Sequence, residues 1–157
     1  MSLYFEWSKE GKNSGNDQRY YFVQAKEMMD VTLDSIVEIL KLDVKITSTM
    51  QKVLLDSKVN LKIETGNPSE YSVHTEFFLW RNNKLLTTEN IALTNQLGQD
   101  GKIKTLMNTI SLSWTDVLLT PGNYTYTLKA RRVETVEENI STIQLKDRAL
   151  NAVVFLH

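Results

Sequence analysis

The chain has no cysteine, and its 157 residues include two histidines and two prolines. The absence of cysteine excludes disulfides, thiolate catalysis, iron–sulfur clusters and cysteine-bound zinc, so stability must come from packing. A catalytic triad or a metal-hydrolase site would have to use His74 or His157, and neither has a ligand-spaced neighbour. We expect His74 to be a strand histidine on a polar or interface face, with a pH sensor or a ligand as the alternative role.

The sequence also lacks an excess of charge of either sign. Its 18 basic and 19 acidic residues leave a formal net charge of −1. The densest basic cluster, Lys129, Arg131 and Arg132, is followed at once by glutamates. Binding to a phosphate backbone needs a clustered basic excess, so we expect no nucleic-acid partner.

Long hydrophobic runs are missing as well. The most apolar segment, 36–46, carries four charged residues, whereas roughly 18 to 20 continuous apolar residues are needed to cross a bilayer. We therefore expect no membrane partner. Residues 1–9 lack the cationic start and the continuous apolar stretch of a secretory signal, so we expect synthesis in the cytoplasm without a signal peptide.

What the sequence does have is a hydrophobic period of two, the pattern of half-buried strands. The segments that show it are 3–7, 19–25, 40–47, 59–64, 71–80, 85–93, 103–114, 123–133, 140–145 and 150–156. Turn-forming residues separate several of them, at Gly66 to Pro68, Asn82-Asn83, 98–101 and Pro121-Gly122. Residues 25–42 fit either a short helix or a broken strand, and we favour strand from about Thr32 onwards.

Seven to ten short strands with short connections and almost no βαβ signal predict an all-β fold, an antiparallel β-sandwich. The length suits one domain, and no repeat or linker divides the chain. We therefore predict a single domain over residues 1–157, with residues 1–18 as an N-terminal arm.

A resemblance to a known family lies in residues 114–128, Trp-Thr-Asp-Val-Leu-Leu-Thr-Pro-Gly-Asn-Tyr-Thr-Tyr-Thr-Leu, followed by a final apolar strand at 150–155. A Pro-Gly turn that leads into a Tyr-x-Tyr strand resembles the later strands of tumour-necrosis-factor-like and complement-head-like jelly rolls. It is also similar to jelly-roll proteins of the bacterial spore surface. The chain departs from these families in having no collagen-like stalk, no cysteine and no recognisable exosporium-targeting leader.

The resemblance implies a jelly-roll topology and a non-enzymatic building block. Such a block would form a trimer, or assemble into a fibre or shell with itself or another structural protein. It would be deposited on a spore or particle surface.

Signs of catalytic or metal chemistry are few. The chain contains no Gly-x-Ser-x-Gly, phosphate-loop, Gly-x-Gly-x-x-Gly or His-Glu-x-x-His motif. Glu134, Glu137 and Glu138 have the oxygen ligands that a divalent cation takes, but acidic loops are usually solvated. We therefore predict no enzyme, no cofactor and no catalytic or metal-binding residue; a small hydrolase that uses His74 and two carboxylates is the weakest alternative.

Aromatic residues supply the candidate interface. Consecutive pairs such as Tyr20-Tyr21 and Phe77-Phe78 must point to opposite faces of a strand, so some rings leave the core. These rings need cover from a second sheet, a neighbouring subunit or a stacked sugar. The residues that we select as interface candidates are Tyr4, Trp7, Tyr20, Phe78 and Trp80.

Two functions follow from this pattern. The leading hypothesis is a structural protein that self-associates through its jelly-roll domain, with residues 1–9 able to complete a neighbour's sheet by strand addition. The alternative is a carbohydrate-binding module, which would need exposed Trp or Tyr rings in a coplanar row on one sheet face.

Overall fold

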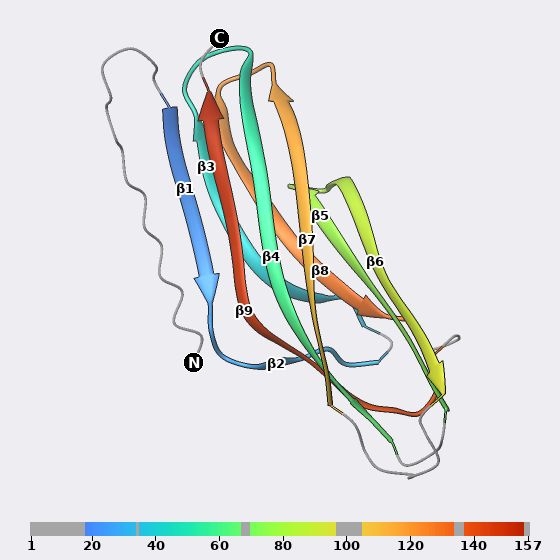
Figure 1. Cartoon of the computed structure of the whole chain (residues 1–157). Helices are drawn as coiled ribbons and strands as arrows, with labels where there is room; N and C mark the ends of the chain where they lie inside the picture. The colour runs from blue at the N-terminus through green and yellow to red at the C-terminus, as the bar shows by residue number, and fades with distance from the viewer. Residues whose placement is uncertain (1–17, 34, 67–69, 97–104, 134–136, 156–157) are drawn as a thin grey trace.

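The computed structural model describes residues 18–33, 35–66, 70–96, 105–133 and 137–155. These residues form nine strands and no helix (Figure 1). The strands are β1 (Gln18–Ala25), β2 (Met29–Asp30), β3 (Val37–Ile46), β4 (Gln51–Thr65), β5 (Glu70–Arg81), β6 (Lys84–Gln96), β7 (Thr105–Leu118), β8 (Gly122–Arg132) and β9 (Ile140–Phe155). Within this part of the chain, no helix is long and apolar enough to span a membrane.

The strands form two antiparallel sheets that face each other. The first, sheet A, has the order β1-β9-β4-β7, with β2 pairing to β9; the second, sheet B, has the order β3-β8-β5-β6 (Figure 1). The long strands therefore pair in a nested way, β1 with β9, β3 with β8, β4 with β7 and β5 with β6. Nested antiparallel pairs rolled into two sheets, each with four of these long strands, are the topology of a jelly roll, which confirms the predicted fold class.

The core lies between the two sheets, and strict alternation builds it. Along β4, every second residue from Gln51 to Thr65 is buried. Its apolar members meet large side chains from sheet B, of which Phe77, Leu79 and Leu128 are fully buried. Successive side chains of a strand point to opposite faces, so half of them fill this core layer and the other half lie on an outer face of the sandwich. Surfaces that can bind a partner are therefore the two outer faces and the strand edges.

Most of the predicted strands are present, and several are longer than the pattern suggested. Segment 140–145 and the described part of segment 150–156, residues 150–155, belong to one strand, β9. β4 begins eight residues before the predicted start at Val59. The hairpin at Asn82 is confirmed, with a positive φ of 49° at that residue. The helix alternative for 25–42 is wrong, because this segment forms β2 and the start of β3, each held by a partner strand. The predicted strand 3–7 and the turns at 67–68 and 98–101 lie outside the described residues.

Candidate interaction surfaces

The predicted interface residues do not form one site. Tyr20 lies on the outer face of sheet A, whereas Phe78 and Trp80 lie on the outer face of sheet B, on the other side of the sandwich. Tyr4 and Trp7 are outside the described residues. Each outer face has therefore to be judged by itself.

On sheet B, cationic side chains cover the two aromatic rings. The Nζ atom of Lys129 lies 5.1 Å from the centre of the Trp80 ring, and the guanidinium of Arg131 lies 5.6 Å from the centre of the Phe78 ring. Arg131 is held in place by an ion pair with Glu76. Because these cation–π contacts occupy ring faces, the pair offers a poor platform for stacking a sugar.

Two ring nitrogens on this face are buried and lack a hydrogen-bond partner in the part of the chain that the structure describes. They are Nε1 of Trp80 and Nε2 of His74. His74 is half-buried on β5, and its backbone oxygen accepts a hydrogen bond from the Val133 nitrogen at 2.9 Å. The Nε2 atom thus has no carboxylate partner among the described residues, and the nearby Glu76 is engaged by Arg131 instead.

The outer face of sheet A carries an apolar surface that we call the outer-face patch. Tyr20, Val153 and Leu54 lie directly opposite one another on the adjacent strands β1, β9 and β4. In the next row, Phe155 and Val117 flank Lys52. With Phe22, which follows Tyr20 on the same side of β1, the patch consists of Tyr20, Phe22, Leu54, Val117, Val153 and Phe155.

The most open members of the patch are Tyr20, Leu54 and Val117, which are 48%, 43% and 46% exposed. Outward positions of a sheet that faces water are normally polar, as they are further down β4 at Lys58 and Asn60. Four neighbouring strands thus carry apolar residues at outward positions, where polar residues are expected, and they do so at the same end of one face. This end lies at the top of Figure 1, where β1 begins and β9 ends.

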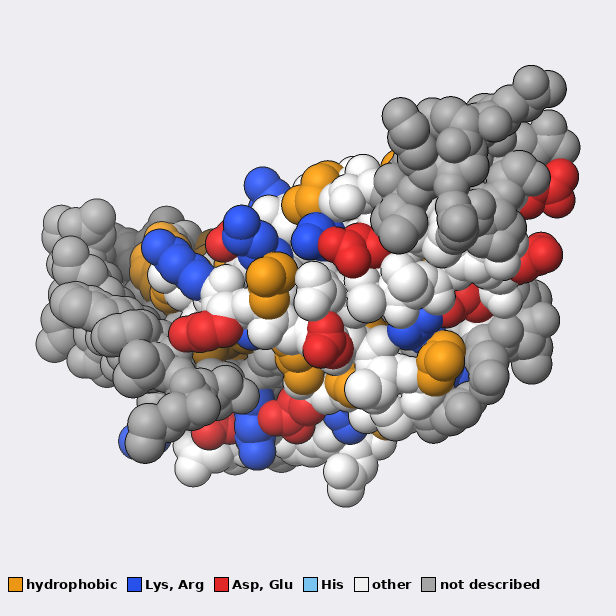
Figure 2. All heavy atoms as spheres, turned by 90° about the horizontal axis from the view of Figure 1, so that it is seen from below, with side chains coloured by type: hydrophobic (Ala, Val, Ile, Leu, Met, Phe, Trp, Pro, Cys, Tyr) orange, Lys and Arg blue, Asp and Glu red, His pale blue; other side chains and the backbone are white. Residues whose placement is uncertain are grey.

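Two turns extend the apolar surface at this end. Met50, in the turn between β3 and β4, is 57% exposed, and Leu119, after β7, is 66% exposed. Met50 has a φ of 59°, a conformation that side chains other than Gly, Asn and Asp rarely adopt. The opposite end, seen in Figure 2, differs in character, because Lys and Arg alternate there with Asp and Glu and the hydrophobic side chains are scattered.

Behind the patch, a polar cluster ties the two sheets together, and we call it the inter-sheet clamp. Nη1 of Arg81, on β5, donates to both carboxylate oxygens of Asp116, on β7, at 2.7 and 2.8 Å. The hydroxyl of Tyr126, on β8, donates to Asp116 at 2.9 Å. Asp116 points inward while its neighbour Val117 points outward, so the clamp holds the part of β7 that displays Val117.

The clamp is suited to stability and not to acid–base chemistry. Burial, with the negative charge of Asp116 as the second cause, raises the pKa of Tyr126 well above its ordinary value. The hydroxyl is therefore a permanent donor near neutral pH. Tyr126 is fully buried and Asp116 is nearly so, which leaves no room for a substrate to reach the pair.

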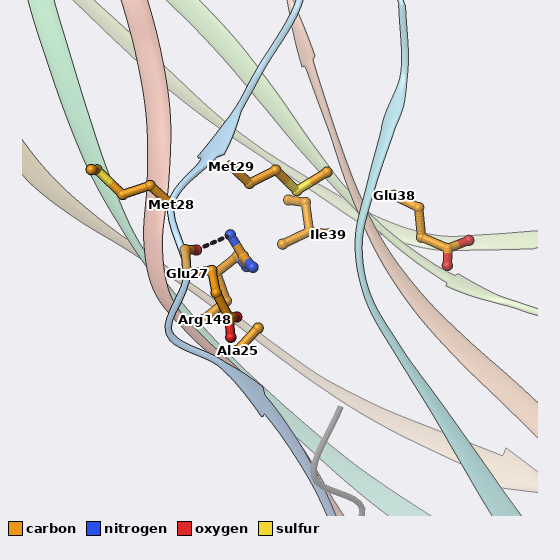
Figure 3. A pocket seen from close by; sticks show the side chains of 7 residues that line it. All are labelled: Ala25, Glu27, Met28, Met29, Glu38, Ile39 and Arg148. Carbon is orange, nitrogen blue, oxygen red and sulfur yellow. Dashed lines mark hydrogen bonds between the residues drawn. The ribbon is translucent and has the colours of Figure 1, made fainter. Parts of the chain in front are cut away.

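A small pocket opens between β1, β2 and β3 (Figure 3). It has a volume of about 180 Å³ and is lined by Ala25, Glu27, Met28, Met29, Glu38, Ile39 and Arg148. Nη1 of Arg148 donates to the backbone oxygens of Glu27 and Leu145, at 2.9 and 3.2 Å. Figure 3 shows the Glu38 carboxylate pointing away from this arginine. Arg148 thus braces the segment after β1, and no catalytic pair is assembled.

The acidic segment that sequence analysis weighed as a cation site is used differently. Glu137 forms a buried ion pair with Arg132, whose Nη1 also donates to the backbone oxygen of Val31 at 3.3 Å. Glu138 pairs through its backbone with Ser72. Among the described residues, no group of three or more His, Asp or Glu side chains could hold a metal ion.

Of the outer-face patch, only Tyr20 is among the residues that the sequence predicts as interface candidates. The available signal was the set of unbroken apolar runs 20–23, 53–55, 117–119 and 152–155. A run of three apolar residues in a strand must place at least one of them on the outer face. The four runs are far apart in the sequence, and only the register of the paired strands shows that they lie side by side.

Comparison with known proteins gives no family. No family model matches the chain, and no curated protein matches it. Among solved structures, the chain is similar to a protein in the crystal structure of the T13 viral particle of infectious bursal disease virus. That match has 8% identity and a TM-score of 0.39, and it covers 88% of this chain and 35% of the viral one.

Two further matches come from the Gx and Gt strains of the same virus. They have 10% and 14% identity and TM-scores of 0.37 and 0.36, and they cover 98% and 97% of this chain. The chain spans about two fifths of those viral chains, 42% and 37%. At these scores the similarity says nothing about what this chain does, and the jelly-roll fold rests on the strand order itself.

Proposed function

We propose that this protein is a non-enzymatic structural building block that self-associates through its jelly-roll domain. The outer-face patch is the observation that carries the proposal, because apolar side chains from four strands meet there and three of them are more than two fifths exposed. Burial of apolar surface is the main driving force of protein association. A second copy of the chain would supply the cover that the patch lacks.

The position of the patch supports a structural role. It includes both edge strands of sheet A, β1 and β7, and the clamp fixes β7 against sheet B. A rigid apolar surface at one end of an elongated sandwich suits head-on or edge-on contacts between identical subunits. The finer form of the proposal, a subunit of a spore-surface layer or fibre, rests on the resemblance of residues 114–128 alone.

The test is a comparison of molar masses in solution for two lysine variants on the same outer face. Val117→Lys places a charge inside the patch, whereas Met107→Lys places one on the same strand near its other end, where Met107 is 61% exposed. We expect Val117→Lys to shift the population toward monomer, because a second charge beside Lys52 at the β7 edge of an apolar contact is costly to desolvate. Met107→Lys should leave the mass unchanged. Equal masses for Val117→Lys and the wild type would count against the patch as the contact.

A further inference from the structure

The edge of β1 that faces away from β9 is the feature that points to a specific occupant. Sheet A ends at β1 and β7, and sheet B ends at β3 and β6. β1 pairs along its whole length with β9, and no described strand pairs with its other edge. Backbone donors and acceptors on such an edge are a template for another strand.

β1 lacks the devices that usually protect an edge. Its sequence, Gln-Arg-Tyr-Tyr-Phe-Val-Gln-Ala, holds one charged residue, no proline and no break in register with β9. The edge strand β3 is different, because it carries four charged residues and its register with β8 shifts between Glu38 and Leu40. β1 is therefore a better acceptor of an added strand than β3. β7 also holds a single charged residue, but it lies at the other edge of the sheet from Tyr20 and Phe22.

The outward side chains of β1 belong to the patch. Tyr20 and Phe22 lie beside Val153 and Asn151 of β9, so a strand added to β1 would continue the apolar row by one more position. Strands lie about 4.8 Å apart and outward residues repeat about every 6.8 Å, which makes the patch on the order of 200 Å². A stable interface between two domains needs about 800 Å² from each partner, so the patch alone suits a short segment better than a whole domain.

Residues 1–9 have the composition of such a segment. Leu3, Phe5 and Trp7 fall on one side of the period of two, and the other side holds Ser2, Tyr4, Glu6 and Ser8. In an added strand, these three apolar side chains would lie on one face, next to Tyr20 and Phe22. Backbone hydrogen bonds to β1 would supply the affinity, and the contacts of the apolar face would fix the register of the added strand.

The connection to β1 favours a neighbour over the same chain. Residues 10–17 separate the segment from Gln18, whereas hairpin loops usually have two to five residues. Eight extended residues reach at most about 28 Å, so the segment need not turn back onto its own β1. We propose that residues 1–9 of one copy add as an edge strand to β1 of a neighbouring copy, with Leu3, Phe5 and Trp7 extending the outer-face patch. This inference rests on the proposed function and names the segment that joins the copies.

The experiment compares three full-length proteins and one deletion by light scattering after size exclusion. They are the wild type, Leu3→Ser/Phe5→Ser/Trp7→Ser, the control Glu6→Gln/Ser8→Ala on the opposite side of the segment, and the chain without residues 1–12. We expect the triple variant and the deletion to dissociate, with an association constant at least about tenfold weaker than that of the wild type and the control. The deletion removes only residues that precede β1, so all nine strands remain.

The outcomes separate the two proposals. An assembled wild type with an equally assembled deletion overturns the strand addition and leaves the proposed function standing. A wild type that is monomeric at every concentration overturns both. The loss of mass in the deletion distinguishes a neighbour's segment from the chain's own, because a segment bound to its own β1 would join no copies. To test that β1 accepts the segment, a labelled peptide of residues 1–9 is titrated into the deletion protein. We expect saturable binding that Tyr20→Lys/Phe22→Lys abolishes, and an absence of binding to the unsubstituted deletion protein would overturn the inference.

Discussion

Loss of Arg81 from the inter-sheet clamp should cost this protein much of its stability. The carboxylate of Asp116 is buried and accepts from Arg81 and Tyr126, so Arg81→Met leaves a buried negative charge with one donor. Removing one partner of a buried ion pair costs roughly 3 to 5 kcal/mol. The side chain of Arg81 is 18% exposed, so water can partly replace it, and we expect the lower end, about 3 kcal/mol.

The assay is urea unfolding followed by tryptophan fluorescence, with thermal unfolding as a second measurement. For a domain of this size, about 3 kcal/mol corresponds to a fall in Tm of roughly 6 to 12 °C. Lys62→Met is the matched control, because the Lys62–Glu64 pair has a similar distance of 2.8 Å but lies on the surface. Exposed ion pairs are screened by water and contribute little to stability, so we expect a much smaller loss from this variant.

A double variant tests the cause of the loss. Arg81→Met/Asp116→Asn removes the stranded charge but keeps an acceptor for Tyr126, so it should be more stable than Arg81→Met alone. If Arg81→Met costs no more than Lys62→Met, or if the double variant is no better than the single one, the clamp does not stabilise the sandwich in this way.

Three further predictions concern the same framework. The pKa of Tyr126 is raised in the folded state, so its contribution to the free energy of unfolding is present below pH about 10 and is lost as the pH rises above that value. Above pH about 10, the free energy of unfolding should therefore fall more steeply in the wild type than in Tyr126→Phe. Met50→Asn should stabilise the chain by about 0.5 kcal/mol, because Asn tolerates the positive φ at this position. The control Met107→Asn lies in a strand and should bring no such gain. If urea unfolding gives changes in the free energy of unfolding of the same sign for both variants, this reasoning is contradicted. Asn82→Ala should lower the free energy of unfolding by about 2 kcal/mol, because Asn82 has a positive φ and its side chain accepts a hydrogen bond from the Thr125 nitrogen at 2.9 Å. A similar loss in Asn83→Ala would refute that reason.

The fold could be predicted from local pattern to a large extent. A period of two, with turn residues such as Asn82 between segments, is a property of neighbouring residues and needs no knowledge of the partner strand. The pattern was least informative at 25–42, where a two-residue strand and a bulged one follow each other. There the partner strands decide the conformation, and they come from much later in the chain.

The candidate site could be predicted only in part. Tyr20 was identified because two consecutive tyrosines cannot both face the core. Leu54 and Val117 were not, since their meaning depends on β4 lying between β9 and β7. Phe78 and Trp80 were selected by the same logic as Tyr20, but the cations that cover them come from β8, a partner that the local pattern does not name.

The most direct test of the central claim is the molar mass of the untagged full-length protein over a wide dilution series, by light scattering after size exclusion. Self-association through the outer-face patch predicts a mass above the 18.1 kDa of one chain that falls toward that value on dilution. A mass of 18.1 kDa at every concentration would contradict the account.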